Sequence, residues 1–414
     1  MYISSDGKAH TYYRLHSSSS EATTASSSSN HNDYIEYLIE EAYDIEHARK
    51  EITLLQQLHH SASSNTSSNH HSTTMSTITT QSTQPIQLSK IITFPLQEIT
   101  NSYYIQTTNN NNNDRTGSTT WDSSIVMSFY FGRHPNQLIG NVLELGSGVG
   151  LGGILTRILS NYNCCCCCYD DGSNNNDVTS FTLSEINRDI LNMLHYNTAA
   201  AAEAVAASSD CTSSGNSDLL KSSCDDDDEF HIERLDWCDF VRANNDTATT
   251  ANNDATRNKK YDTIIASDCI YLASQIRPLS ETIVKLLRRR RQEGKGGGGS
   301  NHDTIPKAHI FSPYNRGAIP DLIQALRAKE ELIVDVETME LSKFRVKSNH
   351  YDDDWNDVSR LNWLLGDENE DDKRQDVVSS CCTSKFLHIT VSFRNDDGVK
   401  ECENDSDMTM IGID

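Results

Sequence analysis

The sequence lacks any apolar run long enough to span a lipid bilayer, and no charged-then-apolar leader opens it. Cysteine occurs at 12 positions, yet five of these form the run Cys164 to Cys168 and two more are the adjacent Cys381 and Cys382. Such spacing is a poor framework for disulfides, and no cluster of His and Cys at metal-ligand spacing accompanies it. We therefore expect a soluble protein in a reducing compartment, without a metal, located in the cytoplasm and also in the nucleus.

Basic residues are also scarce. The chain has 35 Lys and Arg residues against 59 Asp and Glu residues, which gives a formal net charge of −24. Proteins that bind nucleic acids gain most of their affinity from Lys and Arg at the phosphates, so this balance argues against a nucleic-acid partner. A cationic partner, such as a lysine side chain of a protein substrate, is favoured. We expect no membrane partner and a monomer.

Composition divides the chain into three parts. Ser, Thr and Asn dominate much of residues 1–120, and such tracts bury too little apolar surface to offset chain entropy. Within this low-complexity region, apolar spacing predicts an amphipathic helix at 33–58, and residues 86–105 resemble short strands broken by Pro95. Residues 121–395 are predicted to form one core domain with flexible insertions, and residues 396–414 an acidic tail.

The most informative stretch is NVLELGSGVGLGGI, from Asn141 to Ile154. An apolar strand, a glycine cluster and an apolar helix follow one another, an arrangement that brings backbone close to a nucleotide-like ligand. Ser147 and the glycines, including Gly146 and Gly148, would leave several N–H groups free for a carboxylate or a phosphate. The spacing differs from G-x-G-x-x-G and no G-K-[ST] follows, which disfavours dinucleotides and nucleoside triphosphates.

An acid inside this strand, Glu144, points to a different ligand. A phosphate site usually keeps negative charge away, whereas the ammonium group of an amino-acid-bearing cofactor would be attracted by a carboxylate. S-adenosyl-L-methionine, a nucleoside with a zwitterionic amino-acid end, therefore fits best. A tight strand-to-helix turn without a ligand is the alternative.

Polar and aromatic residues follow the ends of other predicted strands. Glu185 comes after strand 178–183, where an acid would hold a ribose diol. Asp236 and Trp237 end strand 230–237, where an acceptor beside an aromatic face suits an adenine. Asp268 ends strand 261–268, and Trp121 begins a helix just upstream of the glycine stretch.

Strands alternate with helices from residue 121 onward, which predicts an α/β fold with a parallel sheet and an antiparallel edge strand. In such sheets ligands bind beyond the carboxyl ends of the strands. The residues singled out above fall at those ends, so we expect one site there.

Four blocks of sequence carry a resemblance to a known family. They are TWDSSIV, NVLELGSGVGLGG, RLDW and YDTIIASDCIY, and they resemble the seven-β-strand, family-16 protein lysine methyltransferases. The first two blocks look most like members that methylate elongation factor 2, whereas DCIYLASQIRPL and FSPYNRG look more like members that methylate calmodulin.

The resemblance implies a Rossmann-like class I methyltransferase fold with a seven-stranded, mostly parallel sheet, and bound S-adenosyl-L-methionine. Trp121 would lie near the cofactor, Gly146, Ser147 and Gly148 at its methionine end and Glu185 at its ribose. Trp237 would flank the adenine, and Ser267 would touch the cofactor. The family more often has Asp at the position of Glu185 and Ala at that of Ser267.

The predicted activity is transfer of a methyl group to a lysine of a protein substrate. Asp268 is the candidate to orient the incoming amine and Tyr271 the candidate to line its channel. Asp268 would otherwise only stabilise the end of its strand. A nucleic-acid or small-molecule methyltransferase, or an inactive cofactor-binding module, are the alternative functions. The nucleic-acid alternative is disfavoured because DCIY stands where a [DNS]-P-P-[YFW] loop would be expected.

Overall fold

The structure is a computed structural model that describes residues 8–15, 36–44, 49–58, 87–99, 116–164, 178–209, 230–243, 259–294, 305–346 and 378–394. The predicted acidic tail and most of the Ser, Thr and Asn tracts lie outside these ranges, as does the Cys run beyond Cys164. In the described part, no helix has the length and apolar character needed to cross a membrane.

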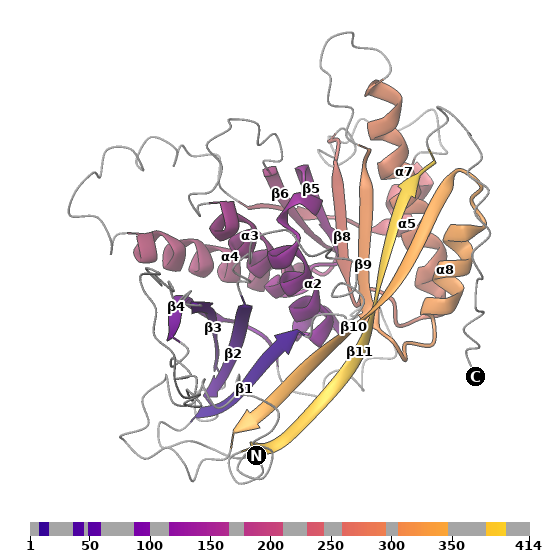
Figure 1. Cartoon of the computed structure of the whole chain (residues 1–414). Coiled ribbons are helices and arrows are strands. Elements are labelled where there is room, and N and C mark those ends of the chain that lie inside the picture. The colour runs from indigo at the N-terminus through magenta and orange to yellow at the C-terminus, as the bar shows by residue number, and fades with distance from the viewer. Residues whose placement is uncertain are drawn as a thin grey trace, which may run out of the picture.

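One sheet runs through the whole described structure. Its order is β4-β3-β2-β1-β10-β11-β9-β8-β5-β6-β7, which makes eleven strands among the described residues (Figure 1). The part predicted to hold the site is parallel, and its strands are β5 (Gly140–Leu145), β6 (Val178–Glu185), β7 (His231–Arg234), β8 (Thr263–Ser267) and β9 (Lys307–Pro313). The prediction of a parallel α/β sheet is confirmed for these five strands.

Two long strands extend the parallel part. β10 (Leu332–Val346) and β11 (Val378–Phe393) pair with each other in antiparallel fashion, and β11 also pairs antiparallel with β9 (Figure 1). β7, β6, β5, β8, β9, β11 and β10 therefore correspond to the seven predicted strands. The antiparallel strand β11 is not at the edge, because β10 lies beyond it and further strands follow.

Those further strands come from the N-terminal region. β1 (Lys8–Leu15), β2 (Glu36–Asp44), β3 (Arg49–Leu58) and β4 (Gln87–Leu96) form an antiparallel meander, and β1 pairs with β10. The predicted count of seven strands is therefore wrong for this chain, because it omits these four.

The helix predicted over residues 33–58 is wrong, since this stretch contains β2 and β3. Its apolar residues fit a helical period, but the side chains that join the main hydrophobic core alternate as a strand requires: Tyr37 with Ile39, and Ile52 with Leu54. Leu38 and Leu55 are buried as well, outside that cluster. Pairing with β1 on one side and β4 on the other outweighs the local pattern.

Pro95 does not break its strand. β4 continues through it to Leu96, and Pro95 lies opposite Glu51 of β3. β4 is the outermost strand, so the missing N–H of a proline is tolerated there. The short strands predicted over residues 86–105 are thus observed as one strand up to Leu96, and the predicted break at Pro95 is wrong. Residues 97–99 are not in a strand, and residues 100–105 lie outside the described part.

Helices cover both faces of the parallel strands, as the alternating pattern predicts. α2 (Asp122–Arg133), α3 (Leu151–Cys164) and α4 (Arg188–Ser209) belong to one hydrophobic core, which also takes in the buried side chains of β1 to β4. α5 (Trp237–Ala243), α7 (Ala273–Gly294) and α8 (Ile319–Arg327) cover the opposite face (Figure 1). Val142 contributes to the first core, and Leu143 and Leu145 to the second, as the two-residue period of a strand requires.

Candidate functional site

A cavity of about 1310 Å³ opens beyond the carboxyl ends of the parallel strands. Its walls come from the segment before α2, the glycine loop between β5 and α3, and the residues that follow β6, β7 and β8. Ten of the eleven predicted site residues line it: Trp121, Gly146, Ser147, Gly148, Glu185, Asp236, Trp237, Ser267, Asp268 and Tyr271. Residues far apart in the sequence therefore meet at one place, as expected for a ligand site in a parallel sheet.

The glycine loop needs glycine at two positions for the site to exist. Gly146 has φ +66°, and a Cβ there would lie 3.3 Å from the Trp237 ring and 3.1 Å from Cys269 Sγ. Gly148 has φ +54°, and its Cβ would lie 2.7 Å from the carbonyl oxygen of Gly117. Larger residues would be strained by the left-handed backbone at both positions, would be tightly packed at Gly146 and would collide with the backbone of Gly117 at Gly148.

The backbone N–H groups of this loop are mostly used inside the protein. Ser147 N–H donates to the Ser184 carbonyl at 2.9 Å, Gly148 N–H donates to Glu185 Oε2 at 3.2 Å, and Gly150 N–H donates to the Ser147 carbonyl at 2.9 Å. The prediction that these residues leave several N–H groups free for an anion is therefore wrong at these three positions. These bonds fix the backbone of the loop where it lines the cavity.

Glu144 is the predicted site residue that does not line the cavity. It is 1 % exposed, and its carboxyl group lies against the first turn of α3, where a Cβ on Gly153 would be 2.5 Å from Oε2. Burial raises the pKa of Glu144 to about 8, so the group is largely protonated at neutral pH. Its predicted attraction for an ammonium group is therefore not supported, and the side chain instead fills the space beneath the turn.

Glu185 stands at the end of β6 as predicted. Its Oε1 accepts the N–H groups of Ile186 and Asn187 at 2.8 and 2.9 Å, and Oε2 accepts that of Gly148. The longer Glu side chain thus bends back to join the glycine loop to the end of β6. A carboxylate has about four lone-pair sites, so after these three bonds at most one is left to accept a hydrogen bond from a hydroxyl group of a ligand.

Asp236 and Trp237 form the wall at the end of β7. Asp236 Oδ1 accepts the N–H groups of Cys238 and Asp239 at 2.8 and 3.2 Å, which caps the first turn of α5. Trp237 begins that helix and packs its ring against Gly146. The cap fixes the backbone at the start of α5, and the indole offers an apolar surface beside Gly146.

Arg316, which sequence reasoning missed, forms an ion pair with the predicted Asp268 in the wall of the cavity. Arg316 donates two hydrogen bonds to Asp268, from Nε to Oδ1 at 2.8 Å and from Nη2 to Oδ2 at 2.6 Å. The Asp268 side chain is 1 % exposed and its backbone has φ +47°, whereas the Arg316 side chain is 29 % exposed. The Arg316 guanidinium also lies 5.2 Å from the ring centroid of Trp121. The only sequence signal was the segment FSPYNRG, which contains Arg316 and carries part of the family resemblance.

Two further predicted residues have smaller contacts. Ser267 Oγ lies 3.2 Å from the Oγ of Ser124 in α2, which ties the end of β8 to the helix that follows Trp121. Tyr271 donates its backbone N–H to Gln275 Oε1 at 3.2 Å, which leads the chain into α7. Both residues face the cavity.

These features fit a zwitterionic nucleoside. Glu185 and Asp236 can accept hydrogen bonds from hydroxyl or amine groups, Trp237 offers an aromatic face, and the glycines allow close approach. S-adenosyl-L-methionine has the ribose, adenine and amino-acid groups that such a cavity accommodates.

Comparison with solved structures gives remote likenesses. A ribosomal RNA methylase from Streptococcus thermophilus has 9 % sequence identity, with 66 % of this chain and 97 % of the other covered and a TM-score of 0.29. The O-methyltransferase TomG from Streptomyces achromogenes, in complex with S-adenosyl-L-methionine, has 8 % identity, coverage of 70 % and 95 %, and a TM-score of 0.27. No curated protein matches the sequence significantly.

The family comparison is more specific. Residues 100–201 and 225–292 match the model of the lysine methyltransferase family, and these residues include every residue that lines the cavity except Arg316. The resemblance that the four sequence blocks predict is confirmed. The chain thus resembles the lysine methyltransferase family over its cavity-forming residues, and it is a methyltransferase whose cofactor is S-adenosyl-L-methionine.

Proposed function

We propose that this methyltransferase modifies a lysine side chain of a protein substrate. The observation that carries the proposal is the family match, because it coincides with the walls of the cavity. The net charge of −24 supports a cationic substrate and disfavours a phosphate backbone. Proteins similar to elongation factor 2 or calmodulin are the first substrates to test, because the motifs resemble those of the corresponding family members.

The chemistry requires an uncharged amine in line with the methyl group. When bound, S-adenosyl-L-methionine supplies an electrophilic methyl group on its sulfonium. A free lysine has a pKa of about 10.4, so deprotonation at pH 7 costs roughly 4 to 5 kcal/mol. The cavity lowers this cost by removing the amine from water, because burial disfavours its charged form. Trp121 and Tyr271 supply aromatic surface for this, and the bound orientation supplies the proximity effect.

Asp268 remains our candidate for orienting the amine, with Tyr271 lining its channel. The ion pair adds a condition to this role, because both Asp268 oxygens accept hydrogen bonds from Arg316. The Asp268 side chain is also only 1 % exposed, so a direct contact with an amine needs better access to the carboxylate, which a shift of the partly exposed Arg316 toward solvent would give. We therefore expect Asp268→Ala to abolish methyl transfer and to leave cofactor binding in place. Unchanged turnover would remove Asp268 from the reaction.

The substrate class is tested by incubating the purified protein with a cell lysate and S-adenosyl-L-methionine that carries a radioactive methyl group. We expect label in a protein band that survives nuclease and is lost with protease, followed by mass spectrometry of its lysines. Gly148→Ala, in which cofactor binding should be weakened more than tenfold, is the control with reduced transfer. Label in RNA or in a small molecule would contradict the lysine proposal, and binding of the cofactor without any transfer would indicate an inactive interaction module.

A further inference from the structure

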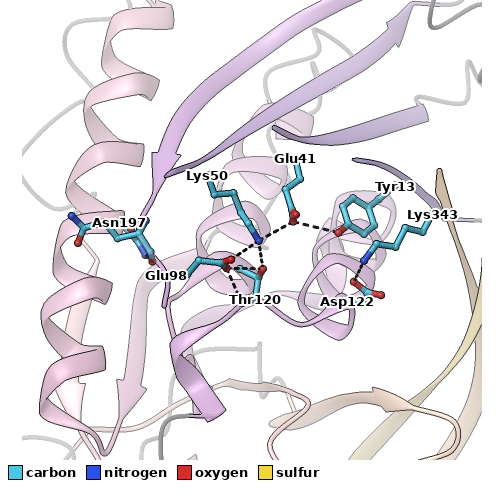
Figure 2. A network of polar contacts seen from close by, with 9 residues as sticks. Tyr13, Glu41, Lys50, Glu98, Thr120, Asp122, Asn197 and Lys343 are labelled. Atoms are coloured by element: carbon cyan, nitrogen blue, oxygen red, sulfur yellow. Dashed lines mark hydrogen bonds and ion pairs between the residues drawn. The ribbon is translucent and has the colours of Figure 1, made fainter. Parts of the chain in front are cut away.

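The N-terminal strands carry a buried ion cluster that reaches the wall of the cavity. Lys50, on β3, is 6 % exposed and lies 3.1 Å from Glu41 Oε2 and 2.9 Å from Glu98 Oε1 (Figure 2). Its Nζ also donates to Thr120 Oγ1 at 2.8 Å. Burial alone lowers the pKa of Lys50, but the two carboxylates outweigh burial and raise it. The residue is therefore a fixed cation in a dry position, directly beside the segment that leads into α2.

Glu98 connects Lys50 to the backbone of the cavity wall. Its Oε2 accepts hydrogen bonds from Thr120 N–H at 3.1 Å and from Thr120 Oγ1 at 3.0 Å. Thr120 lines the cavity, and the next residue is Trp121. Ile99 N–H, one residue after Glu98, donates to the Ser118 carbonyl at 2.8 Å. The stretch that follows β4 thus holds residues 118–120 at two points.

The other neighbour of Trp121 is anchored as well. Asp122 Oδ1 accepts from Lys343 Nζ of β10 at 3.1 Å, and that ammonium lies 4.9 Å from the ring centroid of Tyr13 in β1 (Figure 2). The Tyr13 hydroxyl in turn donates to Glu41, the second carboxylate at Lys50. Trp121 is consequently flanked by Thr120, which bonds Lys50 of β3, and by Asp122, whose partner Lys343 lies on β10 against Tyr13 of β1.

The same stretch also touches the glycine loop. Asn197 of α4 is fully buried, and it accepts from Gln97 N–H at 2.7 Å and donates to the Gln97 carbonyl at 3.0 Å. Its amide also donates to the carbonyl of Val149 at 2.8 Å. Residues 97–99 therefore connect to two walls of the cavity, through Val149 on one side and Ser118 and Thr120 on the other.

We propose that Lys50 is a positioning residue for the cofactor, which acts through Glu98 and Thr120 on the wall formed by residues 118–121. On this view strands β1 to β4 complete the methyltransferase site, although they lie outside the residues matched by the family model.

The inference rests on the cavity being the cofactor site. A purely structural role, in which Lys50 only stabilises the sheet, would leave the affinity of the folded protein for the cofactor unchanged.

The test compares two variants of the full chain. Lys50→Met with Glu98→Gln removes both charges of the pair, whereas Thr53→Val is the matched control. Thr53 is also on β3 and 6 % exposed, and its Oγ1 bonds Thr93 in β4 at 3.0 Å, away from the cavity. Calorimetric titration of S-adenosyl-L-methionine is done where circular dichroism shows both variants folded. We expect about tenfold weaker binding for the double variant, as for one lost hydrogen bond to a charged group, and less than a twofold change for the control.

Equal affinity of the wild type and the folded double variant would overturn the proposal, whereas a wild type that binds no cofactor would refute the cofactor site itself. If the double variant does not fold, the proposal is tested by amide hydrogen exchange of the wild type with and without S-adenosyl-L-methionine. Positional coupling predicts that S-adenosyl-L-methionine increases protection in residues 87–99 and 49–58 as well as in residues 116–124, because coupling between sites is reciprocal. Protection confined to residues 116–124 and the glycine loop would overturn the proposal.

Discussion

The ion pair between Asp268 and Arg316 allows a quantitative test, because its two partners are buried to different degrees. Arg316→Ala leaves a carboxylate whose side chain is 1 % exposed without its counter-ion, which costs about 3 kcal/mol for a buried pair. It also removes the cation–π contact with Trp121, worth about 0.5 to 1 kcal/mol. Asp268→Asn leaves a guanidinium that is 29 % exposed and can be hydrated, so we expect a loss of only about 1 kcal/mol.

Asparagine is the suitable replacement at position 268, because it tolerates the left-handed backbone (φ +47°) better than alanine does. In the double variant the uncompensated carboxylate is absent, so it should be more stable than Arg316→Ala alone by about 2 kcal/mol. Urea unfolding at pH 7, followed by circular dichroism, gives the three free energies of unfolding. If the two single losses simply add, or if Asp268→Asn is the more destabilising change, the assignment of a coupled buried pair is refuted.

Three other changes have outcomes that follow from the geometry. Gly148→Ala places a Cβ 2.7 Å from the Gly117 carbonyl oxygen at a residue with φ +54°. The change should weaken cofactor binding more than tenfold in calorimetry. An affinity equal to that of the wild type would contradict a requirement for glycine at this position. Burial raises the pKa of Glu144 to about 8, so the free energy of unfolding of the wild type should fall as pH rises from 5 to 7. Over that range the free energy of unfolding of Glu144→Gln should increase by about 2 to 3 kcal/mol relative to that of the wild type. A difference between the two proteins that does not change with pH in urea unfolding would rule this out. Burial lowers the pKa of His309 well below its usual value, and His388 and Lys307 lower it further, so wild-type stability should fall by up to about 1.4 kcal/mol per unit as pH drops below about 6.5. In His309→Gln the free energy of unfolding should fall less steeply below about pH 6.5 than in the wild type. An equally steep fall in both proteins would exclude His309 as the cause.

The parallel half of the fold was predictable because its local and global signals agree. In the stretch from Asn141 to Ile154, apolar alternation, glycine and helical periodicity each specify the same strand, turn and helix. The site residues followed, since parallel strands deliver the residues after their carboxyl ends to one edge of the sheet. Glu144 misled the interpretation because a sequence shows that an acid lies near a turn but does not show which way its side chain points.

The N-terminal half was predicted poorly for a different reason. Residues 33–58 carry apolar side chains at spacings that suit both a helix and a strand, and the choice depends on partners elsewhere in the chain. β1 supplies one partner and β4 the other, and β4 comes after a long Ser- and Thr-rich stretch. Arg316 was not predicted because its contacts also depend on residues distant in sequence. Asp268 and Trp121 lie 48 and 195 positions before it.

The ion cluster at Lys50 explains why the N-terminal strands are more than a sheet extension. A buried ammonium is costly unless carboxylates surround it, and replacing such a cluster by apolar residues often stabilises a protein. Stability is therefore a weak reason for Lys50 to be there, whereas fixing one geometry is a stronger one. Through its ion pair with Glu98 and its hydrogen bond to Thr120, Lys50 fixes the backbone beside Trp121. The walls of the cavity come from separate segments, so bonds between those segments restrict how the walls can move relative to one another.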